Sequence, residues 1–275
     1  MEDGRSSELH VTSWGGGEPV VFVHGSFVRG GSSWAAQRPL ADRYRLLFVD
    51  RRGYGASPSS DGEDFARDAD DLVELLGGGA HLVGHSYGGV ASLIAAARRP
   101  SAVRSLTVIE PPAFQLAPAS PTAQAMQERI RIVFGRAADM APAAFYPAFL
   151  EAMGYDLETL GLRSWSDLGA RLRPESLAAM VQSMRQRMPW EAEIPLDRLA
   201  AAAFPKLVIS GGWDTASAAT RASAGAGLRD VCEVLAARIG ARRAVIPGAF
   251  HAPHSAQPAL FNACLRGFLD SAPGS

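Results

Sequence analysis

The residues of this 275-residue chain that could do chemistry centre on Ser86. It lies in a Gly84-x-Ser86-x-Gly88 pattern, between the apolar run 81–83 and the Ala-rich stretch 90–97. This order predicts a strand, a tight turn and a helix, with the serine at the turn. Backbone N–H groups at such a helix N-terminus stabilise negative charge. We therefore interpret Ser86 as a nucleophile, although so short a pattern also occurs in ordinary glycine-rich turns.

A serine nucleophile needs a base, and His251 is the leading candidate. It follows the apolar run 243–246 and a Gly-containing loop. A neutral imidazole can take the serine proton and later return it to a leaving group. The neighbouring His254 is the alternative base.

Two carboxylates could orient that histidine by bonding its distal nitrogen, which fixes the tautomer. Asp214 follows the apolar strand signal at 206–210, and Glu110 follows the one at 105–109. We favour Asp214 and keep Glu110 as the alternative. If these residues had only structural roles, Asp214 would cap the helix that follows it, and Glu110 would brace the hinge of the segment that begins after residue 110.

An oxyanion hole is predicted in the stretch His24-Gly25-Ser26-Phe27, directly after the apolar run 20–23. Its donors would be the backbone N–H groups of Ser26 and of Tyr87, the residue after the nucleophile. The Phe27 N–H is a further candidate. Removing one such donor lowers turnover by about 10²–10³ in a well-studied protease. His24 itself is expected to have a structural, hydrogen-bonded role.

Strand and helix signals alternate over the first 110 residues and again after residue 200. Such alternation with short apolar strands predicts an α/β fold, with a mostly parallel sheet covered by helices on both faces. Ligands bind beyond the carboxyl ends of such strands, so the loops above should converge. The expected strands are 9–14, 20–23, 46–49, 81–83, 105–109, 206–210 and 243–246, and the expected helices of this part are 33–41, 64–76, 90–97, 218–239 and 257–270.

The alternation stops at Pro111-Pro112. Residues 114–199 contain helical signals near 122–135, 141–153 and 175–188, separated by prolines, and no convincing strand. We interpret 114–199 as a helical lid inserted into a core formed by residues 1–113 and 200–275.

Composition sets limits on function. Hydrophobic residues make up 47% of the chain and the net charge is −1, so neither nucleic acid nor an anionic membrane is favoured as a partner. No apolar run approaches the roughly 18 residues of a membrane span. The polar start, residues 1–5, lacks a signal-type apolar core, and cytoplasmic localisation is expected. Cys232 and Cys264 fit buried free thiols in helices. No cofactor or metal is expected, and a homodimer is left open.

With these motifs, the chain resembles members of the α/β-hydrolase superfamily. His24-Gly25, the loop 50–57, the Ser86 pattern, the strand ending at Asp214 and the loop of His251 occur in the order of that family. The resemblance implies a Ser-Asp-His triad and a loop 50–57 that shapes the nucleophile's surroundings without chemistry. The proline expected shortly after the acid is missing, which keeps Glu110 open. Relatives with an aspartate nucleophile, the haloalkane dehalogenases and epoxide hydrolases, are disfavoured by the serine.

The lid suggests a small hydrophobic substrate. Six of the seven methionines lie in it, together with many aromatic residues. A flexible apolar lining suits a hydrophobic ligand, although the same side chains could simply pack the lid onto the body. Arg29 and Arg51 are expected near the mouth as solvated surface residues.

We therefore predict a cofactor-independent serine hydrolase that cleaves an ester, lactone or thioester through an acyl-enzyme. Two alternatives remain open. The same fold and triad serve C–C bond hydrolases, lyases and cyclases, and some relatives only bind a ligand.

Overall fold

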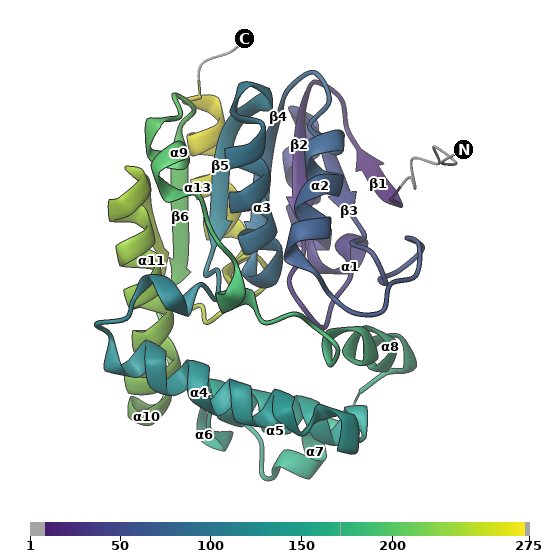
Figure 1. Ribbon diagram of the computed structural model, residues 1–275, viewed down its shortest axis with the longest axis vertical. Coiled ribbons are helices and arrows are strands. Elements are labelled where there is room, and N and C mark those ends of the chain that lie inside the picture. Colours follow the sequence, from purple (N-terminus) through teal and green to yellow (C-terminus); the bar gives the residue numbers. More distant parts are fainter. Residues whose placement is uncertain (1–8, 171, 273–275) are drawn as a thin grey trace.

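A computed structural model describes residues 9–170 and 172–272. Its centre is a seven-stranded sheet in the order β1-β3-β2-β4-β5-β6-β7 (Figure 1). β1 runs antiparallel to β3, and the other neighbours are parallel. The strands are β1 (Val11–Trp14), β2 (Glu18–Val23), β3 (Tyr44–Val49), β4 (Ala80–His85), β5 (Val103–Ile109), β6 (Lys206–Gly211) and β7 (Arg242–Ile246).

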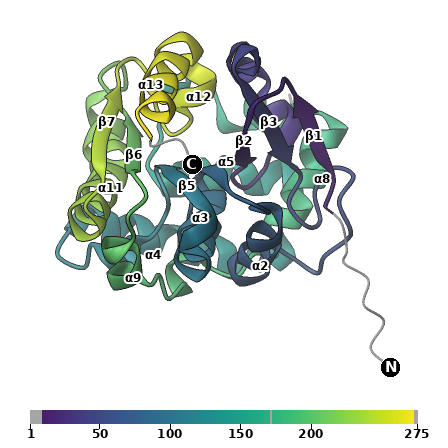
Figure 2. The ribbon, with the colours of Figure 1, turned by 90° about the horizontal axis from the view of Figure 1, so that it is seen from above.

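Helices cover both faces of the sheet, as Figure 2 shows from above. One face carries α2 (Phe65–Leu75), α3 (Ser86–Arg98), α9 (Leu196–Ala201) and α11 (Ala226–Ile239), whose apolar side chains form one buried cluster with the strands. The other face carries α1 (Gly30–Ser33), the 3₁₀ turn at Ala35–Asp42, α12 (Pro253–Ala256) and α13 (Pro258–Asp270). Trp34, Leu40 and Phe261 belong to the cluster on that face. The predicted α/β class and two-sided cover are thus present.

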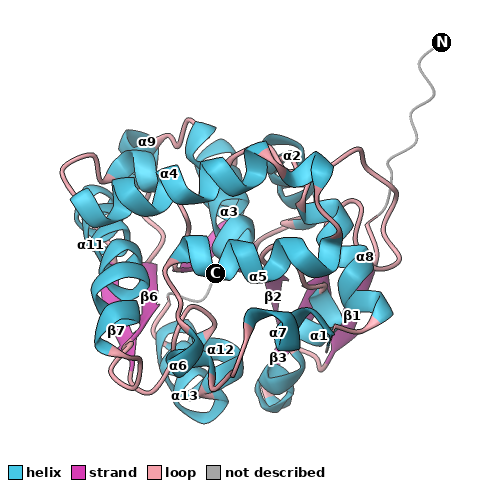
Figure 3. Cartoon of the chain, turned by 90° about the horizontal axis from the view of Figure 1, so that it is seen from below, coloured by secondary structure: helices cyan, strands magenta, loops and turns pink. Residues whose placement is uncertain are grey.

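Between β5 and β6 the described chain is helical and adds no strand to the sheet. We define this helical segment as Phe114–Ala201. Most of it lies across one end of the sheet (Figures 1 and 3), whereas its last helix, α9, lies on the face of the sheet that α3 and α11 cover. Its long helices are α4 (Pro121–Gly135), α5 (Pro142–Met153) and α8 (Pro174–Ser183), with the short helices α6 (Leu157–Leu160) and α7 (Trp165–Ala170) between α5 and α8. It therefore stands over the loops that carry the candidate residues.

Several predicted helices differ in detail. The predicted helix 33–41 is a short α1 followed by a 3₁₀ turn that contains Pro39. The predicted helix 218–239 is interrupted by a π turn at Arg221–Gly225, where a Cβ at Gly225 would lie 2.9 Å from the Trp213 side chain. The predicted helix 175–188 ends at Ser183.

Both cysteines lie in helices and are free. Cys232 is a buried free thiol, and Cys264 is free and only partly buried. In the part of the chain that the structure describes, no helix is long and apolar enough to cross a membrane. The polar start at residues 1–5 lies outside the described residues.

Candidate active site

Ser86 occupies a strained position at the start of a helix. It follows β4 directly and is the first residue of α3. Its φ of 51° lies in the left-handed region, which is unfavourable for a residue with a side chain. Packing enforces the turn, because a Cβ at Gly88 would collide with the carbonyl group of His24 and one at Gly84 with the Ser92 hydroxyl. The two glycines of the pattern are therefore required by close approach of the backbone.

The structure brings His251 to Ser86. The His251 Nε2 atom lies 3.0 Å from the Ser86 Oγ atom, and the His251 Nδ1 atom lies 2.9 Å from Glu110 Oε2. We assign the proton to Nδ1, because a carboxylate oxygen can only accept. Nε2 is then free to accept the serine proton. This is the geometry of an activated nucleophile oriented through a third group.

Glu110 is held rigidly in this position. It follows β5, is fully buried and adopts a φ of 40°. Its Oε1 atom accepts hydrogen bonds from the Gly211 N–H (2.9 Å) and the Trp213 Nε1–H (3.0 Å). These two donors and His251 satisfy the buried carboxylate, which would otherwise be costly to bury.

Trp213 is a site residue that the sequence prediction missed. It is buried, contacts Tyr155 and Phe250, and donates its indole N–H to the triad carboxylate. The available signal was indirect: a buried tryptophan usually gives its N–H a partner, and Trp213 immediately precedes the carboxylate that was favoured.

The prediction of Asp214 as the orienting acid is wrong in this structure. Asp214 is exposed, and its Oδ1 atom accepts the Gly248 N–H at 2.8 Å. Trp213 has a φ of 56°, and its side chain is the one from this loop that reaches Glu110. Asp214 instead ties the loop after β6 to the loop after β7.

His254, the alternative base, occupies a different environment. It is buried, its ring centroid lies 4.2 Å from that of Trp34, and its Nε2 atom is 3.4 Å from Ser33 Oγ. Burial lowers the pKa of His254 to about 3, so the ring is neutral. Among the described residues, His251 and not His254 accepts the hydrogen bond of the Ser86 hydroxyl.

The proposed oxyanion donors are not equivalent. The Phe27 N–H already donates to the Ser183 hydroxyl at 2.8 Å, so the prediction of Phe27 as an oxyanion donor is not supported by this structure. Tyr87 lies in the first turn of α3, where amides have no partner within the helix. A Cβ at Gly25 would lie 2.9 Å from Ser86 Cβ, so the Ser26 loop passes close to the nucleophile. The amides of Ser26 and Tyr87 remain the candidate pair.

Arg51 is buried beside the loop of Gly25 and Ser26. The expectation that it would be a solvated residue at the mouth of the site is wrong. It is 1% exposed, and its guanidinium donates to the Gly25 carbonyl (3.1 Å), Glu63 (2.8 Å) and Asp68 (2.7 Å). Two carboxylates compensate the buried cation, which explains why it can leave the surface. Burial raises the pKa of Asp68 to about 6.

His24 has the hydrogen-bonded position that was expected for it. Its Nδ1–H donates to the Gly25 carbonyl at 2.7 Å, and its Nε2 accepts the Arg51 N–H at 3.1 Å. Burial and the nearby guanidinium lower the pKa of His24, so it stays neutral. The loop 50–57 therefore supports the oxyanion loop through Arg51.

A cavity of about 570 Å³ opens beside Ser86 and His251. The helical segment supplies most of its apolar wall, and among the described residues no Asp, Glu, Lys or Arg lines it. Two of the six methionines of the segment line the cavity, whereas Met126 is buried in the core formed with α11. The main apolar lining residues are Phe114, Ile130, Phe149, Met153, Leu160, Met180 and Trp190.

Within residues 9–170 and 172–272, no group of three or more His, Cys, Asp or Glu residues is arranged to hold a metal ion. The polar groups around Ser86 are those of a proton-transfer site.

Known proteins share this sequence and fold. A family model described as the alpha/beta hydrolase family matches residues 20–263. A pimeloyl-[acyl-carrier protein] methyl ester esterase of Methylococcus capsulatus is 33% identical over 175 residues, which are 62% of this chain and 68% of that protein. The non-heme chloroperoxidase CPO-A1 of Kitasatospora aureofaciens is 44% identical over 89 residues, 30% of this chain and 32% of that protein.

Solved structures agree with the fold over almost the whole chain. A thermophilic esterase from Thermogutta terrifontis superposes with a TM-score of 0.69 at 25% identity, covering 96% of this chain and 93% of that one. Est816, described as an N-acyl homoserine lactone degrading enzyme, gives a TM-score of 0.65 at 22% identity, with 97% and 98% covered. Several curated relatives are matched over less than half of their own length.

Proposed function

The chain belongs to the α/β-hydrolase family, and from this premise we propose that it hydrolyses a neutral, largely apolar carboxylic ester, lactone or thioester through an acyl-enzyme at Ser86. One observation carries the proposal: the hydrogen-bonded series Ser86–His251–Glu110 borders a cavity with no charged lining residue among those described.

The reaction follows from the geometry. His251 Nε2 removes the proton of Ser86 as Oγ attacks the substrate carbonyl carbon, and Glu110 stabilises the imidazolium that forms. The amides of Ser26 and Tyr87 hold the negative oxygen of the tetrahedral intermediate. The carbon–leaving-group bond breaks as His251 returns the proton to the leaving oxygen or sulfur. Water, activated by the same histidine, then releases the acid and restores the Ser86 hydroxyl.

The uncharged lining limits the substrate. A carboxylate or phosphate placed deep in this cavity would lose water without gaining a cation among the described lining residues. A neutral acyl chain instead gains free energy by leaving water for Phe149, Met153 and Met180. Two of the similar proteins, those of Methylococcus capsulatus and Thermogutta terrifontis, are also esterases by name.

We also propose that residues 114–199 act as a lid on a core of residues 1–113 and 200–275. The support is that helices α4, α5 and α8 lie over the sheet end and supply the cavity wall.

The test is a Ser86→Ala variant assayed against p-nitrophenyl esters of increasing acyl length and against lactones. We expect turnover to fall by about 10³-fold or more, because an alanine cannot form the acyl-enzyme. A Ser271→Ala variant, at the exposed end of α13, serves as the matched control and should keep full turnover. Undiminished turnover in Ser86→Ala would contradict the proposed acyl-enzyme mechanism. A fluorophosphonate should label Ser86 in the parent, as shown by peptide mass spectrometry.

A further inference from the structure

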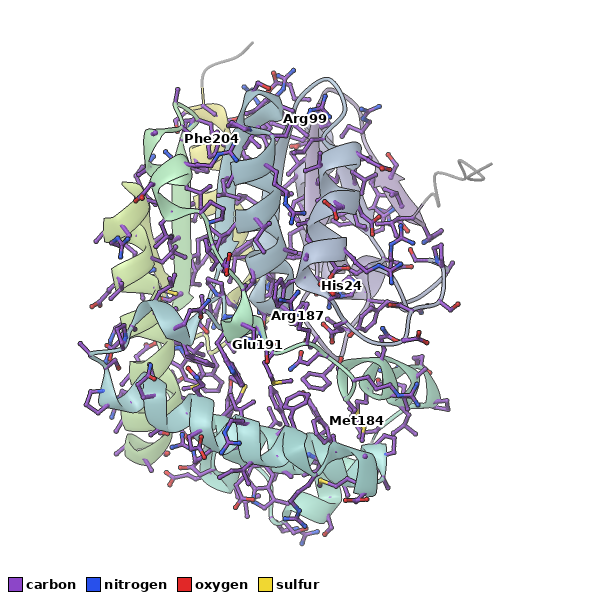
Figure 4. The ribbon with its side chains drawn as sticks, in the orientation of Figure 1. His24, Arg99, Met184, Arg187, Glu191 and Phe204 are labelled. Carbon is purple, nitrogen blue, oxygen red and sulfur yellow. The ribbon has the colours of Figure 1, made fainter. Side chains whose placement is uncertain are left out.

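A short stretch of the helical segment contacts the residues that carry both proposed oxyanion amides. We propose that Ser183–Arg187, the end of α8 and the turn after it, positions the oxyanion hole, with Ser183 as the principal positioning residue. This inference rests on the proposed function. Figure 4 shows the chain passing from Met184 beside α8 to Arg187 near the end of the sheet.

The first contact fixes the backbone next to Ser26. The Phe27 N–H donates to Ser183 Oγ at 2.8 Å, and Phe27 has a φ of 68°. A phenylalanine in the left-handed region persists only where its surroundings hold it. Ser183 can hold it because its hydroxyl is itself fixed by the Tyr54 hydroxyl (2.7 Å) and the Ala179 carbonyl (3.0 Å). The peptide unit shared by Ser26 and Phe27 is thus anchored to α8.

The second contact fixes the Ser26 side chain. Its Oγ atom lies 3.2 Å from Gln186 Oε1 and 3.0 Å from Glu63 Oε2, both acceptors for the single hydroxyl proton. Glu63 is buried and bound by Arg51, which also holds the Gly25 carbonyl. Ser26 therefore lies between the buried ion pair of the core and the helical segment.

The third contact reaches the other donor residue, Tyr87. Its hydroxyl donates to the Arg187 carbonyl at 3.0 Å, and the Arg187 N–H donates to the Glu63 carbonyl at 2.8 Å. The same hydroxyl accepts the Phe65 N–H at 3.1 Å. One peptide stretch thereby connects the side chain of Tyr87 to the strand-exit loop that carries Ser26.

These contacts matter for catalysis because oxyanion donors work at about 2.7–3.1 Å from the developing charge. A shift of a few tenths of an ångström in the Ser26 loop weakens that bond in the transition state and leaves substrate binding unchanged. Loss of the Ser183 hydroxyl should therefore reduce kcat and not raise KM. The stretch continues from cavity-lining Met180 to cavity-lining Pro189, so the wall and the oxyanion hole share one support.

The experiment compares Ser183→Ala with Ser183→Thr, which keeps a hydroxyl. Ser217→Ala is the matched control, because the Ser217 hydroxyl bonds Asp156 of the helical segment at a junction away from the oxyanion loop. Steady-state kinetics use a p-nitrophenyl ester. Inhibition by phenylboronic acid reports on the site independently, because its serine adduct is tetrahedral and places an oxygen where the oxyanion forms.

We expect Ser183→Ala to lower kcat by about 10-fold, less than the 10²–10³ for removing a donor outright, with KM within about twofold. Its phenylboronic acid inhibition constant should rise by the same factor. Ser183→Thr should recover most of both losses, and Ser217→Ala should show neither. Should Ser183→Ala fail to fold, Gln186→Met removes the Ser26 contact instead and should move kcat and the inhibition constant in the same direction.

Two results would overturn the inference alone: parental kcat and boronic acid inhibition in Ser183→Ala, or equal losses in Ser217→Ala. A parent enzyme without Ser86-dependent turnover would overturn the proposed function, and the inference with it.

Discussion

The loops after β5 and β6 start from similar sequence signals and have opposite roles. Each follows a buried strand, carries an acidic residue and contains one residue with positive φ, Glu110 at 40° and Trp213 at 56°. In the first loop the acid itself occupies the strained position and is fully buried against His251. In the second loop a tryptophan occupies it, and Asp214 follows one residue later in solvent. The residue at the turn, and not the presence of a carboxylate, decides which group reaches the histidine.

The comparison is tested most severely by Glu110→Gln. The amide keeps the shape of the carboxylate, yet it can no longer stabilise an imidazolium or enforce the tautomer with a free Nε2. We expect kcat to fall by about 10³–10⁴-fold, as for the equivalent change in a serine protease triad. The measurement is ester turnover at pH 7.5, with circular dichroism to verify folding. A loss of less than tenfold would remove Glu110 from the mechanism.

The Trp213→Phe variant tests whether the loop after β6 positions Glu110 in the loop after β5. The ring is kept, while Glu110 loses one of its three hydrogen bonds and becomes easier to displace. We expect kcat to fall by about tenfold with little change in KM, in keeping with one hydrogen bond to a charged group. Trp165→Phe is the matched control and should retain full kcat. Equal kcat in the two variants would show that the indole N–H has no part in positioning the acid.

The chain after β7 carries two histidines, His251 in the loop and His254 in α12, and the stability of the protein at acid pH tests the environment of His254. His254 has a pKa of about 3 in the folded protein against 6.5 ordinarily, because it is buried. The unfolded chain therefore binds an extra proton below pH 6.5. The stability that the buried, neutral His254 contributes is fully present above pH 6.5. As the pH falls from 6.5 toward 3, the free energy of unfolding decreases by about 1.4 kcal/mol per pH unit.

Buried His24 and His85 have lowered pKa values and add effects of the same sign. Urea unfolding at pH 7.5, 6.0 and 5.0 measures the slope. His254→Gln should flatten it by about one proton's contribution relative to the parent, while the other groups cancel in the difference. Identical slopes would mean that His254 is charged in the folded state.

Asp214→Asn should have the smallest effect on the reaction. The asparagine Oδ1 can still accept the Gly248 N–H, so the tie between the two loops survives. We expect kcat within about twofold of the parent, as for surface changes remote from the chemistry. A loss approaching that of Glu110→Gln would reverse the assignment of the acid.

The two candidate carboxylates also show which part of the site could not be predicted from the sequence. Ser86 and His251 were predictable because a glycine-bounded turn and a strand exit fix backbone geometry locally. The choice between Glu110 and Asp214 was not, since it depends on which side chain the turn directs inward. The alternating strands and helices predicted the sheet. The π turn at Arg221–Gly225 was not predicted; Gly225 packs there against Trp213, a tertiary contact that no local pattern shows.

The support of the oxyanion loop was less predictable still. Ser183 lies 156 residues from Phe27 along the chain, and no local pattern connects them. Arg51 was expected in solvent because an isolated arginine belongs there. Its burial depends on Glu63 and Asp68 converging on it, which only the folded chain reveals.

The most direct test of the Ser86–His251–Glu110 assignment is the rate at which a fluorophosphonate labels Ser86 in the parent, in Glu110→Gln and in Asp214→Asn. Labelling reports the nucleophilicity of the serine without reference to the natural substrate. We expect slow labelling in Glu110→Gln and parental rates in Asp214→Asn. Slow labelling in Asp214→Asn together with parental rates in Glu110→Gln would contradict the assignment.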